Sequence, residues 1–140
     1  MTEEHALKTV EAMPMAESPM AQLANAEIVV GYMADKCKGP RFLSNIQGRS
    51  YPRVEWWTTV GFALGLSPLE VSNVRLDRQG ECTYEAVVEV RRMNDGAIIS
   101  RGSALCSSTE SAWGNRDEYA IKSMAATRAT GKAYRIGLSF

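Results

Sequence analysis

The stretch CTYEAVVEVRRMNDGAIISRGSALC, residues 82–106, decides the fold of this chain. Its first half alternates between two sets of side chains, one small or apolar and the other richer in charge: Tyr84, Ala86, Val88 and Val90 against Glu85, Val87, Glu89 and Arg91. A period of two is typical of a strand with one buried face and one largely wet face. Asn94-Asp95-Gly96 is a strong hairpin turn signal. The stretch therefore predicts two antiparallel strands, 82–93 and 97–106, in a sheet covered on one side.

The flanking segments extend this hairpin into an α+β domain. A third strand is predicted at 69–76, joined through the turn Arg78-Gln79-Gly80. Upstream, the patterns predict a helix at 20–38 that Gly39-Pro40 ends, a hairpin of 42–47 and 50–53 that turns at Gly48-Arg49, and a helix at 54–65. Downstream, a polar loop at 107–116 leads into a helix at 117–140. The predicted order is α-β-β-α-β-β-β-α, an antiparallel sheet of hairpin and meander with helices on one face.

Length and composition predict one domain of a soluble globular protein. The chain has 140 residues, 45% hydrophobic and 23% charged, against a typical ~150 residues per domain. We expect residues 1–19 to be a mobile, acidic lead-in and residues 20–140 to be the domain. The acidic start leads into no apolar block, and no apolar run approaches a membrane span, so a cytoplasmic protein without membrane contact is expected. Three irregularly spaced cysteines, Cys37, Cys82 and Cys106, suit reduced thiols in a core.

The formal net charge is zero, but the charge is unevenly distributed. Residues 1–36 carry two cations and six acids, which gives 2 − 6 = −4. The remaining residues carry 14 cations and ten acids, which gives 14 − 10 = +4. An acidic arm before a basic body is a modest indication that the body contacts a polyanion.

The helix predicted at 117–140 carries the clearest functional signal. Beyond Glu118 its charged residues are all cations, Lys122, Arg128, Lys132 and Arg135, and the last three share one sector of the helix. We expect the opposite side to pack through a small and apolar stripe: Tyr119, Ala126, Ala129, Ala133, Ile136 and Gly137. One face would then pack while the other presents charge to an anionic partner. The alternative is an ordinary solvated cationic face, although surface helices usually mix both signs.

Other residues are weaker candidates for nucleic-acid contact. Lys38 and Arg41 precede the predicted hairpin, and Arg49 and Arg53 lie at its turn and end. The alternative for these four is that they are exposed loop cations without a partner. Among the tryptophans, Trp113 in the polar loop is the possible base-stacking residue. Trp56 and Trp57 are adjacent on a helix, so we expect one in the core and the other covering its edge or a subunit interface.

Tests for catalytic chemistry are mostly negative. His5 is the sole histidine, so neither a catalytic triad nor a histidine metal site is expected. Gly131-Lys132 is followed by Ala133 where a phosphate-binding loop needs Ser or Thr. Glu110, Asp117 and Glu118 are a weak candidate for binding Mg²⁺, but acids at a helix start are better explained by the helix dipole. We therefore expect a protein that is not an enzyme and needs no cofactor.

The segment Ala125-Ala126-Thr127-Arg128-Ala129-Thr130-Gly131-Lys132-Ala133-Tyr134-Arg135 resembles the end of a helix in the single-strand annealing recombinases. That family comprises the phage Erf and Sak types and the related eukaryotic recombination mediator, and its helix reads roughly Ala-x-Thr-Asp-Gly-x-Lys-Arg-Ala-Leu-Arg after a three-stranded meander. Val88-x-Val90, Asp95-Gly96 and Gly102 are also similar, so the resemblance covers about 42–140. The chain departs from the family pattern at Arg128, where Asp is common, and at Gly131, where the first of two adjacent cations usually lies.

The resemblance implies an oligomeric ring whose outer groove holds single-stranded DNA by its backbone and anneals complementary strands without ATP, in recombination or repair. Partners would then be single-stranded DNA, further copies of the chain, and possible recombination proteins such as a single-strand binding protein. Cations in a line suit this role on chemical grounds also, because annealing needs the phosphates held and the bases free. The alternative function is a non-enzymatic oligomeric scaffold whose cations bind acidic protein partners.

Overall fold

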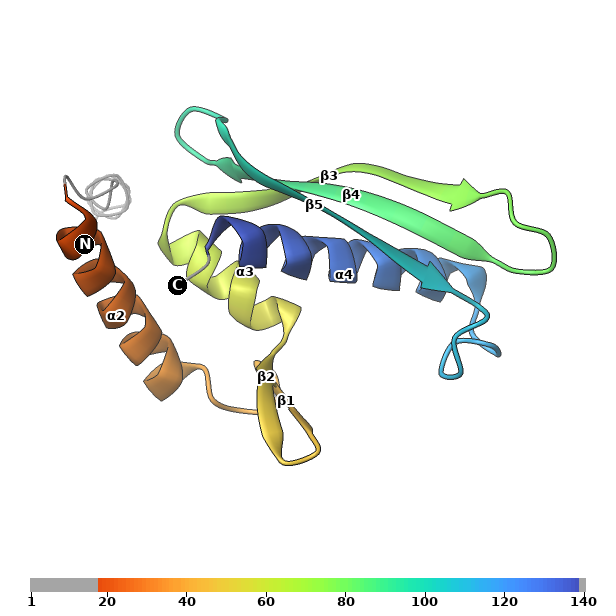
Figure 1. The fold of residues 1–140 in the computed structure, drawn as a ribbon, viewed down its shortest axis with the longest axis horizontal. Coiled ribbons are helices and arrows are strands. Elements are labelled where there is room, and N and C mark those ends of the chain that lie inside the picture. The colour runs from red at the N-terminus through yellow and green to blue at the C-terminus, as the bar shows by residue number, and fades with distance from the viewer. Residues whose placement is uncertain (1–17, 139–140) are drawn as a thin grey trace, which may run out of the picture.

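The computed structural model describes residues 18–138, and the fold is the expected α+β arrangement (Figure 1). Most of the expected lead-in, His5 included, and the last two residues of the expected terminal helix lie outside the described residues. The elements are α2 (Pro19–Lys36), β1 (Leu43–Ile46), β2 (Arg49–Pro52), α3 (Val54–Ala63), β3 (Leu66–Leu76), β4 (Thr83–Arg92), β5 (Ile98–Ser107) and α4 (Glu118–Gly137). The strands form two separate antiparallel sheets, β1-β2 and β3-β4-β5.

Turn chemistry explains where the hairpins reverse. Gln47 and Gly48 both have positive φ, 53° and 79°, which is the conformation of two-residue turns that match strand twist. The prediction of a turn at Gly48-Arg49 was therefore one residue late, and Arg49 belongs to β2. In the β4–β5 turn, the Asp95 carboxylate accepts from the Ala97 N–H at 3.0 Å, and Gly96 takes the positive φ of 73°.

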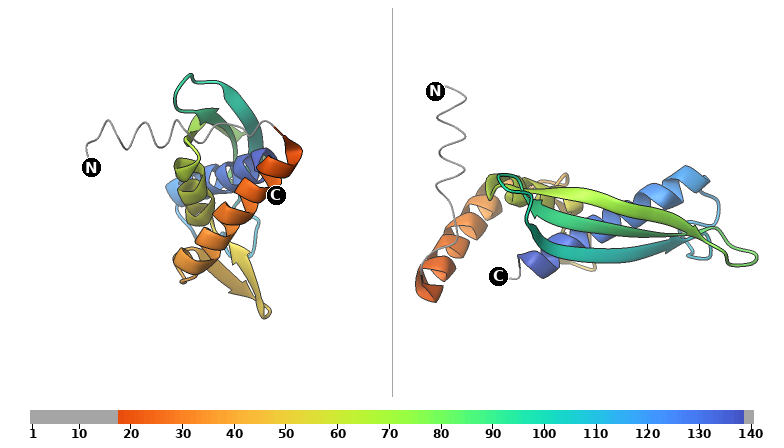
Figure 2. Two further views of the ribbon diagram at one scale, coloured as in Figure 1. Left: turned by 90° about the vertical axis from the view of Figure 1, so that its left-hand side faces the viewer. Right: turned by 90° about the horizontal axis from the view of Figure 1, so that it is seen from above.

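The helix α4 covers one face of the three-stranded sheet and makes the main core (Figure 2). Ala125, Ala129 and Ala133 are fully buried against the sheet residues Ala86, Val88, Val90 and Cys106. The small side chains allow close approach, and Gly102 on β5 allows the closest. A Cβ there would lie 2.6 Å from the Ala133 nitrogen and 2.9 Å from the Ala129 oxygen. Ser100 fastens the same strand by donating to the Ala133 carbonyl at 2.6 Å.

The expected packing stripe of α4 was wrong at both of its ends. Tyr119 is 72% exposed and Ile136 is 54% exposed, whereas Ile121 and Tyr134 are buried. Steps of four residues from Ala129 reach Ile121 on the sheet side, while Tyr119 lies about 160° around the helix from Ile121. Near its C-terminus α4 also packs against α3, so burial there turns toward Tyr134. Burial raises the pKa of Tyr134 to about 12.

The opposite face of the sheet is not covered by any element of residues 18–138 (Figure 2). The expectation that it is largely wet was wrong for Glu89, which is 2% exposed. Its carboxylate accepts from Arg91 at 2.7 Å and from Arg101 at 2.6 Å, so the two guanidinium groups cover it. These hydrogen bonds hold the pKa of Glu89 below its usual range, and the bond from Arg91 has the larger effect. The carboxylate is thus charged and paired at neutral pH.

We predict that Glu89→Gln destabilises the protein at pH 7 and that the effect shrinks in acid. Because the pKa is lower in the folded than in the unfolded chain, the stabilisation is present above the unfolded value near 4.5 and is lost as the pH falls through the folded value. Urea unfolding of wild type and variant at pH 7 and pH 3 measures the difference. A difference that stays constant between the two pH values would contradict this account.

A small second core joins α2 to α3. Met33, Cys37 and Val60 are buried together, and Phe42 and Trp56 pack partly against them. All three cysteines are free thiols, with Cys37 and Cys106 buried and Cys82 half-buried. Among the helices of residues 18–138, none has the length and apolar character needed to cross a membrane.

Candidate nucleic-acid interface

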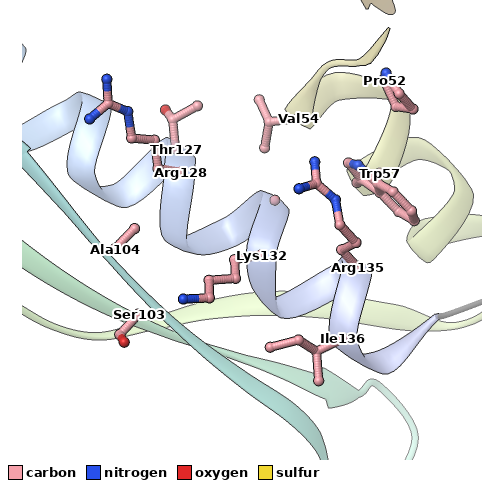
Figure 3. Close-up of a pocket in the computed structure, with 11 residues that line it drawn as sticks. Pro52, Val54, Trp57, Ser103, Ala104, Thr127, Arg128, Lys132, Arg135 and Ile136 are labelled. Atoms are coloured by element: carbon pink, nitrogen blue, oxygen red, sulfur yellow. The ribbon is translucent and has the colours of Figure 1, made fainter.

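An open groove of about 640 Å³ runs along the outer side of α4 (Figure 3). One wall is the C-terminal half of α4, a second is the middle of the edge strand β5, and the third is the junction between β2 and α3. Its lining residues are Pro52, Val54, Trp57, Ser103, Ala104, Thr127, Arg128, Gly131, Lys132, Arg135 and Ile136. The structure thus brings three of the predicted DNA-binding residues, Arg128, Lys132 and Arg135, into one concave surface.

The charged residues that line this groove are all cations. Their spacing of four and three residues places them on one side of α4. Gly131 lies between them, and a Cβ at that position would meet nothing within 4 Å. Lys132 is exposed and its ammonium group has no ion-pair partner in residues 18–138. The groove therefore offers positive charge to a ligand that can enter from solvent.

Arg128 is less available than its helix position predicts. Its guanidinium donates to both carboxylate oxygens of Glu110, at 2.8 and 3.0 Å, and to the Leu105 carbonyl at 2.9 Å. The Arg128 hydrogen bonds hold the pKa of Glu110 below its usual range, and the Ser107 N–H adds to this effect. Arg128 thus ties the loop after β5 to α4. Of the three cations expected to be free, Lys132 and Arg135 are accessible and Arg128 is already paired.

Trp57 is the groove residue that sequence reasoning missed as a binding candidate. It extends from α3 toward Arg135, whose guanidinium carbon lies 5.9 Å from the centre of the indole ring. The Trp56 ring supports it from behind in an edge-to-face contact at 4.9 Å. The indole Nε1–H is buried and has no hydrogen-bond partner within residues 18–138. The adjacent tryptophans were a signal, but only the packing of α3 against α4 shows which one faces the cations.

The other predicted cations do not line the groove. The ammonium nitrogen of Lys122 lies 5.9 Å from the ring centre of Tyr84. The backbone carbonyl of Lys122 accepts a hydrogen bond from the Asn73 side chain of β3. Arg53 is held near the groove mouth, where it donates to the Pro40 carbonyl at 3.0 Å and approaches Glu55 at 3.8 Å. Three further cations lie before or on the hairpin: Lys38, 4.0 Å from Asp35, Arg41, stacked on Phe42, and Arg49, which begins β2.

Trp113, the predicted stacking residue, lies outside the groove. Its half-buried ring packs against the main core, and the Arg116 guanidinium lies over it at 5.7 Å. The ring thus closes one end of the core below the loop 108–117. Its position supports a packing role and leaves Trp57 as the aromatic residue of the groove.

Two of the three carboxylates considered for Mg²⁺ are engaged by other side chains. Glu118 accepts from Arg75 at 2.6 Å and from Tyr84 at 2.7 Å, and its pKa is lowered, first by the Tyr84 hydrogen bond. Glu110 is bound to Arg128. Asp117 is the N-cap residue of α4, without a side-chain capping bond. Within residues 18–138 no three His, Cys, Asp or Glu side chains gather as a metal site.

No family model matches the chain, and no curated protein or solved structure matches it either. The functional assignment therefore depends on the groove and on the resemblance noted in the sequence.

Proposed function

We propose that the protein binds single-stranded DNA in this groove and anneals complementary strands without ATP, as an oligomeric ring that acts in recombination or repair in the cytoplasm. The observation that carries the proposal is the groove itself, whose lining includes Lys132, Arg135 and Trp57 and no acid. A single-strand binding protein or another recombination protein is a possible partner. The cations act on phosphates, so the chemistry requires no catalytic residue or cofactor.

The geometry supports backbone binding rather than base reading. Residues three apart on a helix have Cβ atoms about 5–6 Å apart, so Lys132 and Arg135 can bind the same stretch of sugar-phosphate backbone. Both cations can bind any phosphate, whatever the base attached to it. Trp57 adds an aromatic ring to the lining at the same place. Bases that are not gripped stay available to a complementary strand.

Titration of a fluorescently labelled oligonucleotide tests the proposal. We expect single strands to bind more tightly than duplex, binding to weaken steeply with salt, and a quenched pair of complementary strands to anneal faster in the presence of the protein without ATP. A poly-glutamate peptide of equal charge is the comparison for the scaffold alternative. Binding of the peptide without binding of the oligonucleotide would reject the DNA proposal in favour of acidic protein partners.

We predict that Glu110→Gln tightens oligonucleotide binding. Loss of the carboxylate releases the Arg128 guanidinium into the groove, which adds one phosphate contact. The slope of log affinity against log salt should steepen by about 0.7, the value for one contact on a single strand. Titrations at several salt concentrations measure it.

Glu118→Gln is the matched control for this variant. It changes the net charge equally, but the carboxylate is bound to Arg75 and Tyr84 away from the groove. Its salt slope should equal that of the wild type. Equal effects of the two variants would show that net charge, and not Arg128, controls binding.

A further inference from the structure

The uncovered face of the three-stranded sheet carries exposed apolar side chains beside its charged ones. The cross-strand row Val74, Glu85 and Leu105 lies on this face, and Leu69 lies further along β3 opposite Glu89. Leu69, Val74 and Leu105 are 44%, 55% and 38% exposed. Exposed apolar side chains on one uncovered face are a feature of interaction surfaces.

A second uncovered apolar surface lies on α2. The helix is held to the body by Met33 and Cys37, near its C-terminal end. On the outward side, Met20, Leu23 and Ile28 are 75%, 57% and 69% exposed. Glu27 falls in the same sector of the helix, and no cation of residues 18–138 pairs with it.

The two surfaces match in size and in charge. The 18 residues of α2 span about 27 Å at 1.5 Å per residue, and the ten residues of β4 span about 33 Å at 3.3 Å per residue. On the sheet, one buried carboxylate, Glu89, is shared by two arginines, and Arg101 is still 61% exposed. That end of the sheet has an excess cation, whereas the outward side of α2 has Glu27, which pairs with no cation of the described residues.

We propose that α2 of one copy packs on the uncovered sheet face of the next copy. The sheet would then lie between two helices, its own α4 and the neighbour's α2, and Glu27 would approach the Arg91 and Arg101 pair. The protomer's own α2 cannot occupy this place, because Met33 and Cys37 fasten it to α3 beyond the end of the sheet (Figure 1). The inference rests on the oligomer in the proposed function and specifies how it assembles.

Joining two different surfaces produces a head-to-tail interface. A growing oligomer then has one unused α2 at one end and one unused sheet face at the other, so assembly continues, and it stops when the copies close into a ring. An interface between two like surfaces would stop at a dimer. This difference makes the proposal testable by mixing variants.

Light scattering after size exclusion, on wild type and two single variants, is the experiment. Ile28→Asp removes the α2 surface and Val74→Asp removes the sheet surface, at exposed positions that the folded protomer tolerates. Wild type should be a large oligomer, and each variant alone should be a monomer. A mixture of the two variants should form a heterodimer and nothing larger, because one variant keeps its sheet face and the other keeps its α2. Tyr119→Asp, 72% exposed at the start of α4, is the control and should stay oligomeric.

Disulfide capture is a second readout that does not depend on the acidic variants being folded. Copies carrying Ile28→Cys, mixed with copies carrying Val74→Cys, should form disulfide-linked heterodimers in excess over either protein alone. A monomeric wild type, an oligomeric Ile28→Asp protein, or the absence of the mixed disulfide would each overturn the proposal. Binding of a short oligonucleotide by the monomeric variants reports on the groove separately, so failure of the interface and failure of the DNA proposal are distinguishable.

Discussion

Replacement of both Lys132 and Arg135 by alanine is expected to abolish oligonucleotide binding and leave the fold intact. Both side chains are exposed and line the groove (Figure 3). A hydrogen bond to a charged group contributes about 1.5–3 kcal/mol, so two such contacts account for a loss of at least about 100-fold in affinity. The salt slope should also fall by about 1.4, or about 0.7 for each lost phosphate contact. Fluorescence titration measures the affinity and circular dichroism checks the fold.

Arg116→Ala combined with Lys122→Ala is the matched control. This pair removes the same charge outside the groove. Arg116 lies in the loop over Trp113, and Lys122 lies on α4 near Tyr84. Its affinity should stay within a few-fold of the wild type. Unchanged affinity in the Lys132/Arg135 variant, or an equal loss in both variants, would reject the groove as the DNA site.

Substitution of Gly102 by alanine is expected to be strongly destabilising for the addition of a single methyl group. The new Cβ would meet backbone atoms of α4, the Ala133 nitrogen at 2.6 Å and the Ala129 oxygen at 2.9 Å, and backbone cannot rotate aside as a side chain can. Overpacking usually costs about 1–3 kcal/mol, and we expect the upper end of that range because the main core must open. Urea or thermal unfolding measures the loss.

Gly131→Ala provides the comparison for Gly102→Ala. It adds the same methyl group in the interior of α4, where nothing lies within 4 Å of the new Cβ. The protein should gain about 0.5–1 kcal/mol, since glycine is that much poorer than alanine inside a helix. Equal stability of the Gly102→Ala variant and the wild type would show that α4 and β5 are further apart than the structure places them.

The sequence alone determined the order of elements and most of the cation sector of α4. Alternation in residues 82–106 and the Asn94-Asp95-Gly96 turn are local signals, so they predict strands and a hairpin without knowledge of the tertiary contacts. Hairpin register also follows from a short turn, although the reversal at Gln47-Gly48 was misplaced by one residue. Helical spacing was enough to group Arg128, Lys132 and Arg135 on one side.

Only the tertiary structure decided which of those cations are accessible and what stands opposite them. The pairing of Arg128 with Glu110 and the approach of Trp57 to Arg135 join segments that no local period relates. The burial of Glu89 is of the same kind, because Arg101 comes from the neighbouring strand. Periodicity tells which face of an element is apolar, whereas ion pairs and aromatic contacts depend on how side chains from distant elements meet. The ammonium of Lys132 and the ring of Trp57 share one groove because α3 packs against the end of α4.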